Sequence, residues 1–174
     1  MGRIFILLIS TNFFHGSFSV NTAGIFLNIL EKMEKEEHPE AVCVAFDLHG
    51  PTFRHLKYDG YKATRHGMPE ELAVQMPYAK RVAEALGFTI IEKEGYEADD
   101  ILGSLANHAN DSGEDVLSLI MTGDKDSLQL INDKTAILLA TNVDYVYFDR
   151  DAFREKYGVS PLVYRKNVDK QKYI

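Results

Sequence analysis

The hydrophobic positions of the chain alternate between two spacings, one typical of buried strands and one typical of amphipathic helices. Continuous apolar runs predict strands at residues 3–9, 41–46, 88–91, 116–121, 136–139 and 145–148. Helical spacing predicts helices at residues 24–33, 69–86 and 150–157, another between Glu97 and Gly113, and a short one carrying Leu128 and Ile131. Strands that alternate with helices indicate an α/β protein, a three-layer α/β/α sandwich with a mainly parallel central sheet.

Several segments do not follow these two spacings. Residues 48–68 have no clear period and are rich in Gly, His, Tyr and basic groups, so we expect a long functional loop, partly helical once occupied. The charged run 34–37 is expected to end the first helix, and Pro77 to kink or divide the helix that starts at Pro69. We expect one domain over residues 1–161 and a polar C-terminal tail over 162–174.

Composition is that of an ordinary globular domain. The chain has 174 residues, 45% of them hydrophobic, and a net charge of −7. The single cysteine, Cys43, lies in an apolar run, which excludes a disulfide framework and favours a buried, inert thiol. No apolar run reaches the ~18–20 residues of a membrane span, and the apolar start is too short for the core of a signal peptide. We therefore expect a reducing, cytoplasmic location and no membrane partner.

Acidic residues follow three of the predicted strands. They are Asp47 after the second strand, Glu97, Asp99 and Asp100 after the third, and Asp124 and Asp126 after the fourth. Because the carboxyl ends of parallel strands meet at one edge of a sheet, these acids are expected to lie together. Charge at a helix N-terminus, worth ~0.3–1 kcal/mol per acid, accounts for one or two of the acids in the 97–100 turn. A divalent-cation site is the other interpretation of that turn, and crowded carboxylates in any case require a positive charge among them.

The type of ligand points to particular ions. No Cys or His cluster with zinc spacing accompanies the acids, so their hard oxygen ligands favour Mg²⁺ or Mn²⁺. Up to two ions are expected, because a pair of such ions can activate water and stabilise the leaving oxygen of a phosphodiester.

A basic and aromatic stretch supplies the complementary half of a site for a polyanion. Lys62 and Arg65 share a face if their segment is helical, and Arg54 is suited to bidentate contact with a phosphate. Tyr58 and Tyr61 are suited to stacking on unpaired bases. Mixed Tyr, Lys and Arg loops are also common on ordinary protein surfaces, and this alternative stays open on the stretch alone.

Together, these segments closely resemble the 5′→3′ exonuclease (flap endonuclease) family, which includes the N-terminal nuclease domain of bacterial DNA polymerase I. The resemblance runs in consistent order from about Ala41 to Gly158. The motifs that carry it are VAFD (44–47), GPTFRH (50–55), YKATR (61–65), MPEEL (68–72), EGYEADD (94–100) and TGDKD (122–126). It implies a PIN-like (resolvase-like) fold and action on DNA with 5′ ends or flaps, with RNA primers as a second candidate substrate.

The resemblance also implies roles for individual residues. Asp47, Glu97, Asp99 and Asp100 become ligands of a first metal ion, and Asp124 and Asp126 ligands of a second. Lys62 and Arg65 become the catalytic basic residues that grip the 5′ strand and assist at the scissile phosphate. Arg54, Tyr58 and Tyr61 complete the nucleic-acid-binding set.

Two departures from the family pattern predict weakened activity. The family places an Asp directly after its first strand, where this chain has Ser10 or Ile9, depending on how Asn12 is aligned. Beyond Gly158 the sequence does not resemble the helical region that supplies further second-site acids. The alternative function is a catalytically degenerate module that binds nucleic acid or a partner, and a phosphatase-like hydrolase is a third, weaker interpretation. The sequence does not indicate a homo-oligomer.

Overall fold

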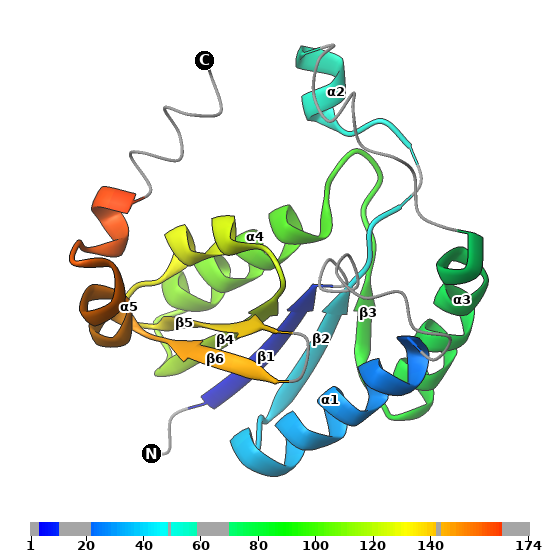
Figure 1. The fold of residues 1–174 in the computed structure, drawn as a ribbon, viewed down its shortest axis with the longest axis horizontal. Coiled ribbons are helices and arrows are strands. Elements are labelled where there is room, and N and C mark those ends of the chain that lie inside the picture. The colour runs from blue at the N-terminus through cyan, green and yellow to red at the C-terminus, as the bar shows by residue number, and fades with distance from the viewer. Residues whose placement is uncertain (1–3, 11–21, 49, 59–69, 142–143, 165–174) are drawn as a thin grey trace.

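The computed structural model describes residues 4–10, 22–48, 50–58, 70–141 and 144–164. Within them, one sheet of six strands has the order β3-β2-β1-β4-β5-β6 (Figure 1). The strands are β1 (Ile4–Ser10), β2 (Ala41–Ala45), β3 (Thr89–Ile91), β4 (Val116–Thr122), β5 (Thr135–Ala140) and β6 (Tyr145–Phe148). All neighbouring pairs are parallel except β5 and β6. The mainly parallel sheet is therefore confirmed.

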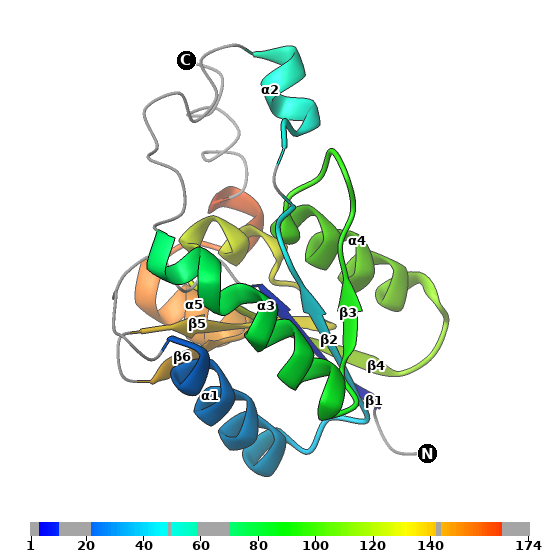
Figure 2. The same cartoon turned by 90° about the vertical axis from the view of Figure 1, so that its right-hand side faces the viewer.

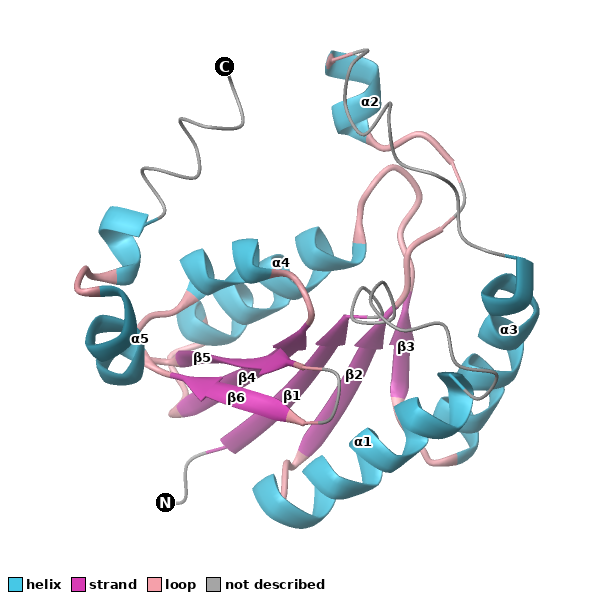
Figure 3. Ribbon diagram, in the orientation of Figure 1, coloured by secondary structure: helices cyan, strands magenta, loops and turns pink. Residues whose placement is uncertain are grey.

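Helices cover both faces of this sheet, which confirms the three-layer sandwich (Figures 2 and 3). The helices are α1 (Thr22–Glu37), α2 (Phe53–Lys57), α3 (Glu70–Ala85), α4 (Ala98–Asp111), the 3₁₀ helix η2 (Lys125–Leu130) and α5 (Arg150–Tyr157). Helices α1 and α3 pack on one face, and α4, η2 and α5 on the other. Among the described residues, none of these helices is long and apolar enough to cross a membrane.

The face under α1 and α3 is closed by a mixture of large and small side chains. Leu30 and Met33 of α1 and Ala79 and Ala83 of α3 are buried against Val44, Leu119, Met121 and Leu138 of the sheet. The two alanines let α3 lie close to the strands, and the longer side chains of α1 fill the remaining space at the density of a protein interior.

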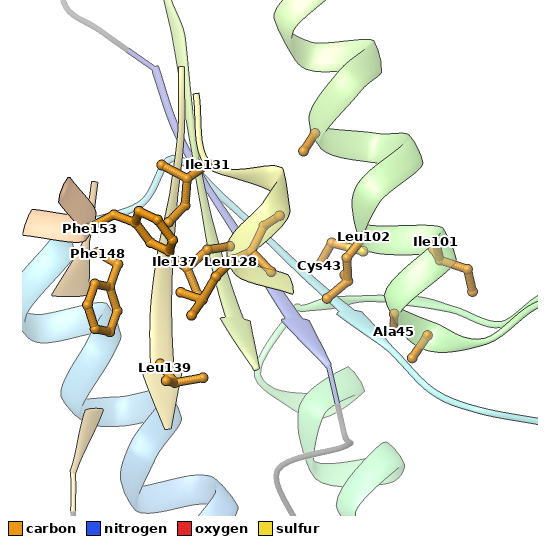
Figure 4. Close-up of a cluster of buried hydrophobic side chains, with 13 residues drawn as sticks. Cys43, Ala45, Ile101, Leu102, Leu128, Ile131, Ile137, Leu139, Phe148 and Phe153 are labelled. Atoms are coloured by element: carbon orange, nitrogen blue, oxygen red, sulfur yellow. The ribbon is translucent and has the colours of Figure 1, made fainter. Parts of the chain in front are cut away.

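The opposite face carries the second apolar cluster and fixes helix α4 (Figure 4). Leu102 of α4 is 1% exposed and packs with Leu128 of η2 and Ile120 of β4. Phe148 and Phe153 close the end of the cluster near α5. Burial of apolar surface stabilises this packing by about 25 cal/mol per Å². It therefore holds α4, and with it the first turn of that helix, in a fixed position beside the sheet edge.

Helix α1 is longer, and helix α3 less interrupted, than the sequence pattern suggested. Helix α1 continues through the charged run to Glu37, because Lys35 pairs with Glu31 at 3.4 Å and Lys32 with Glu36 at 3.9 Å, one helical turn apart. Of the two effects expected of Pro77, a kink or a division, division does not occur, because α3 is one helix from Glu70 to Ala85. Its second half is anchored by the buried Ala79 and Ala83, which outweighs the one backbone hydrogen bond that proline cannot donate.

Helix occurs in the segment expected to be a partly helical loop and in the segment expected to be a polar tail. Residues Phe53–Lys57 form α2 within the predicted loop. Residues 161–164, mostly within the predicted polar tail, form a helical turn, and the Tyr164 ring packs on Phe153 with 5.4 Å between centroids. The aromatic contact orders a stretch that has no hydrophobic period of its own.

Cys43 provides a test of the core packing. Burial raises the pKa of its thiol to about 11. At pH 8 we expect native protein to react with a disulfide reagent such as DTNB at least roughly a hundredfold more slowly than denatured protein, because the thiolate is the reacting species. The folded-state pKa is raised, so the stabilising contribution of this group is present below pH 9 and is lost as the pH rises toward 11. Equal rates in native and denatured samples would contradict a buried thiol.

Candidate metal and nucleic-acid site

The acidic residues predicted to share one sheet edge do follow the carboxyl ends of parallel strands. Asp47 lies two residues beyond the end of β2, and Asp124 two residues beyond the end of β4. Glu97, Asp99 and Asp100 lie at the start of α4, which follows β3. In Figure 1 the β3–α4 connection rises from this edge toward α2.

Asp47 joins the loop after β2 to the beginning of α4. Its Oδ1 accepts a hydrogen bond from the Ala98 backbone N–H at 2.6 Å. Ala98 is fully buried and is the first residue of the helix, so its N–H has no partner within the helix itself. The carboxylate satisfies that donor and lies in the favourable field of the helix N-terminus.

A cation from elsewhere in the chain lies among the acids of the 97–100 turn. The Arg54 guanidinium donates from Nη1 to Asp100 Oδ2 and from Nη2 to Asp100 Oδ1, each at 2.6 Å. Its Nη1 is also 3.7 Å from Glu97 Oε2. Asp100 in addition accepts the Glu97 backbone N–H at 3.1 Å. The requirement for positive charge among these acids is met by an arginine 46 residues away, which no local pattern could identify.

The other predicted ligands occupy related positions. Asp99 is partly buried in the first turn of α4. Asp124 is the N-cap of η2, and its Oδ1 accepts the Asp126 backbone N–H at 2.8 Å. Thr122, the last residue of β4, accepts the Asp124 N–H at its hydroxyl at 3.1 Å. The Asp124–Asp126 pair is therefore shaped by a local turn of the backbone.

Tyr164 is a neighbour of this second acidic pair that the sequence did not suggest. Burial raises the pKa of its hydroxyl, and the charges of Asp126 and Asp124 raise it further. The ring is held by contacts with Phe153 and Tyr157, at 5.4 and 6.0 Å between centroids. The aromatic cluster thus orders part of a segment expected to be a polar tail.

The acids do not converge into a closed ligand cluster. Among the residues that the structure describes, no three His, Cys, Asp or Glu side chains lie together in a group able to hold a metal ion. Helix N-terminal charge and capping explain the contacts of Asp47 and of Asp100 with backbone N–H groups. Two observations fit a divalent ion. The donors are hard carboxylate oxygens. In addition, Glu97 and Asp100 already bind a positive charge, the Arg54 guanidinium.

Two of the five predicted nucleic-acid-binding residues, Arg54 and Tyr58, lie among the residues that the structure describes. Tyr58 is exposed at the end of α2, and Arg54 forms ion pairs with Glu97 and Asp100. Tyr61, Lys62 and Arg65 lie outside the described residues. Helix α2 itself has no buried side chain and projects from the sheet on the side of the acidic residues (Figures 1 and 2).

The sequence matches the family described as "5'-3' exonuclease, N-terminal resolvase-like domain" over residues 3–158. The chain belongs to this family. The DNA polymerase I of Caldicellulosiruptor bescii is 41% identical over 138 residues, which are 77% of this chain and 16% of that protein. The DNA polymerase I of Mycobacterium tuberculosis H37Rv is 36% identical over 165 residues, 93% of this chain and 18% of that protein. The chain thus spans less than a fifth of the length of these curated relatives.

Solved structures show the same fold at low sequence identity. The T5 D15 protein co-crystallised with metal ions has a TM-score of 0.65 and 20% identity, covering 90% of this chain and 61% of that one. The catalytic core of Rad2 in complex with DNA substrate has a TM-score of 0.53 and 16% identity, covering 91% of this chain and 50% of that one. The PIN-like 5′-nuclease fold is therefore confirmed.

Gly95 tests the turn that presents the acids. Its φ is +80°, and its carbonyl accepts the Phe53 N–H at 2.9 Å. We expect Gly95→Ala to lower the free energy of unfolding by about 1–2 kcal/mol, from the left-handed backbone alone, because an added Cβ meets no atom within 4 Å.

Gly103→Ala is the matched control for that substitution. This glycine is helical, and an added Cβ would contact Leu130 at 3.5 Å, an ordinary van der Waals distance. It should raise the free energy of unfolding by about 0.5–1 kcal/mol through helix propensity. Both values come from urea denaturation, and a neutral or stabilising Gly95→Ala would contradict the assigned turn.

Proposed function

We propose that this chain is a divalent-metal-dependent 5′→3′ exonuclease or flap endonuclease domain that binds DNA and hydrolyses phosphodiesters near 5′ ends, with weakened activity. The observation that supports it is the placement of acids from three strand-to-helix connections at one sheet edge, beside a cationic helix, in a chain of this family. Asp47, Glu97, Asp99 and Asp100 would hold one ion, and Asp124 and Asp126 a second. Bound Mg²⁺ or Mn²⁺ would activate water and stabilise the leaving oxygen.

Basic and aromatic side chains of the chain would bind the DNA substrate. Lys62 and Arg65 would bind the phosphate at the reacting position and offset the negative charge that develops there. Tyr58 and Tyr61 would stack on bases of the single-stranded 5′ end. Arg54 would contact a neighbouring phosphate with its two-pronged guanidinium. Each of these residues comes from the segment between β2 and α3, so one segment would hold the substrate over the acids.

Cleavage of a labelled 5′-flap DNA tests the proposal. With Mg²⁺ or Mn²⁺ we expect slow, metal-dependent cleavage, and the double variant Asp99→Ala/Asp124→Ala should reduce it by at least about a thousandfold by removing a ligand from each ion. Asp111→Ala is the matched control, because this exposed acid lies at the opposite end of α4. DNA binding is measured on the same samples.

The results separate the enzyme from its alternative. Cleavage that survives in the double variant would contradict the assigned metal ligands. Binding without any cleavage would instead support a degenerate nucleic-acid-binding module, a function favoured by the Arg54–Asp100 ion pair and by the dispersed acids in the described residues.

Ser10 offers a gain-of-function test of weakened activity. It is the last residue of β1, in register with Ala45, the last residue of β2. An acid at this point would join those that follow β2 and β4 on either side. We expect Ser10→Asp to raise the rate of metal-dependent cleavage by roughly tenfold or more, by strengthening ion binding. Ser10→Asn, of the same size without the charge, is the control, and equal rates in both variants would argue against a missing acid.

A further inference from the structure

Helix α2 is attached to the body of the protein by contacts with the acidic turn. The Phe53 N–H donates to the Gly95 carbonyl at 2.9 Å, and the Phe53 ring lies 5.5 Å from the Tyr96 ring, centroid to centroid. The next residue, Arg54, adds its ion pair with Asp100. Since α2 has no buried side chain, these contacts are important in fixing its base.

The ion pair uses the carboxylate that the proposed first metal site also requires. Both oxygens of Asp100 accept Arg54 N–H groups at 2.6 Å, and Glu97 is 3.7 Å from the same guanidinium. The side chains are sheltered, with 31% of Arg54, 15% of Glu97 and 19% of Asp100 exposed. Charges so placed are screened less by salt than charges on an open surface.

A divalent ion and this guanidinium are poorly compatible on one carboxylate. A bidentate arginine occupies both oxygens in the plane of the group, and a second cation there would lie within a few ångströms of the first. We propose that Arg54 is the resident counter-cation of Asp100 and Glu97, and that a divalent ion displaces it on binding. This inference rests on the proposed function, because it takes Asp100 and Glu97 as metal ligands.

Displacement would make Arg54 available at the moment when the ion is bound. By thermodynamic reciprocity, a metal that competes with Arg54 for Asp100 strengthens the binding of any anion that Arg54 accepts in its new position. The guanidinium's fork fits a phosphate as well as a carboxylate. Metal loading and phosphate binding near α2 would therefore be positively coupled through one side chain.

Binding of Mn²⁺ alone, followed by the electron paramagnetic resonance of free Mn²⁺ at low ionic strength, tests the competition without measuring activity. Arg54→Met should bind Mn²⁺ at least about fivefold more tightly than wild type, because the competing charge is absent. Lys57→Met is the matched control. It removes the same charge from the same helix, but Lys57 is exposed and lies over the Phe53 ring instead of on the acids. Its affinity should stay within about twofold of wild type.

Arg54→Lys keeps the charge but loses the two-pronged geometry, so it should give an intermediate affinity. Circular dichroism shows whether Arg54→Met folds. If it does not, Arg54→Lys serves as the test, and a Mn²⁺ affinity equal to or weaker than that of wild type would overturn the inference. If Arg54→Met folds but binds Mn²⁺ no more tightly than Lys57→Met, the displacement of Arg54 is contradicted, while the proposed metal site itself still stands. If wild type and all folded variants fail to bind millimolar Mn²⁺, the proposed metal site itself falls, and the inference with it.

Discussion

The parallel alignment of β1 to β5 is the constraint on which the site depends. Each strand must begin at the same edge of the sheet, so every connection that leaves a strand starts from the opposite edge. Asp47, the start of α4 and Asp124 are brought to that edge although strand β3 and two helices lie between the first two, and strand β4 between the last two. The two apolar faces hold the helices that fix this arrangement, with Leu102 anchoring α4 and Met33 anchoring α1.

Electrostatics then decides how these acids can coexist. The N-terminus of α4 offsets part of the charge through the hydrogen bonds that Asp47 and Asp100 accept from backbone N–H groups. The Arg54 guanidinium offsets more. These contacts leave the Glu97 and Asp100 side chains 15% and 19% exposed. The same contacts hold the carboxylates in an arrangement that a metal site would have to change.

The sequence predicted most of the framework. Strand β6 and helix α5 match the expected ranges, because a continuous apolar run and a helix stop at Gly158 are local signals. The same is true of the acids at the strand ends, since their location follows from strand direction alone. The predicted ranges were less accurate where a local signal competed with packing: α3 is one helix across Pro77, and α1 extends beyond the predicted 24–33 to Glu37. The roles of the individual ligands remain predictions.

The contacts that the sequence could not predict are long-range ones. Nothing near Arg54 in the sequence indicates that it pairs with Asp100, and nothing near Tyr164 indicates that it packs on Phe153. Arg54 contacts the acids of the 97–100 turn, whereas Tyr164 packs on Phe153 and Tyr157 of α5. In α2, the Arg54–Asp100 ion pair adds to the backbone hydrogen bond and the ring contact made by Phe53. If a divalent ion displaces Arg54 from Asp100, as proposed, α2 would lose one of the contacts at its base.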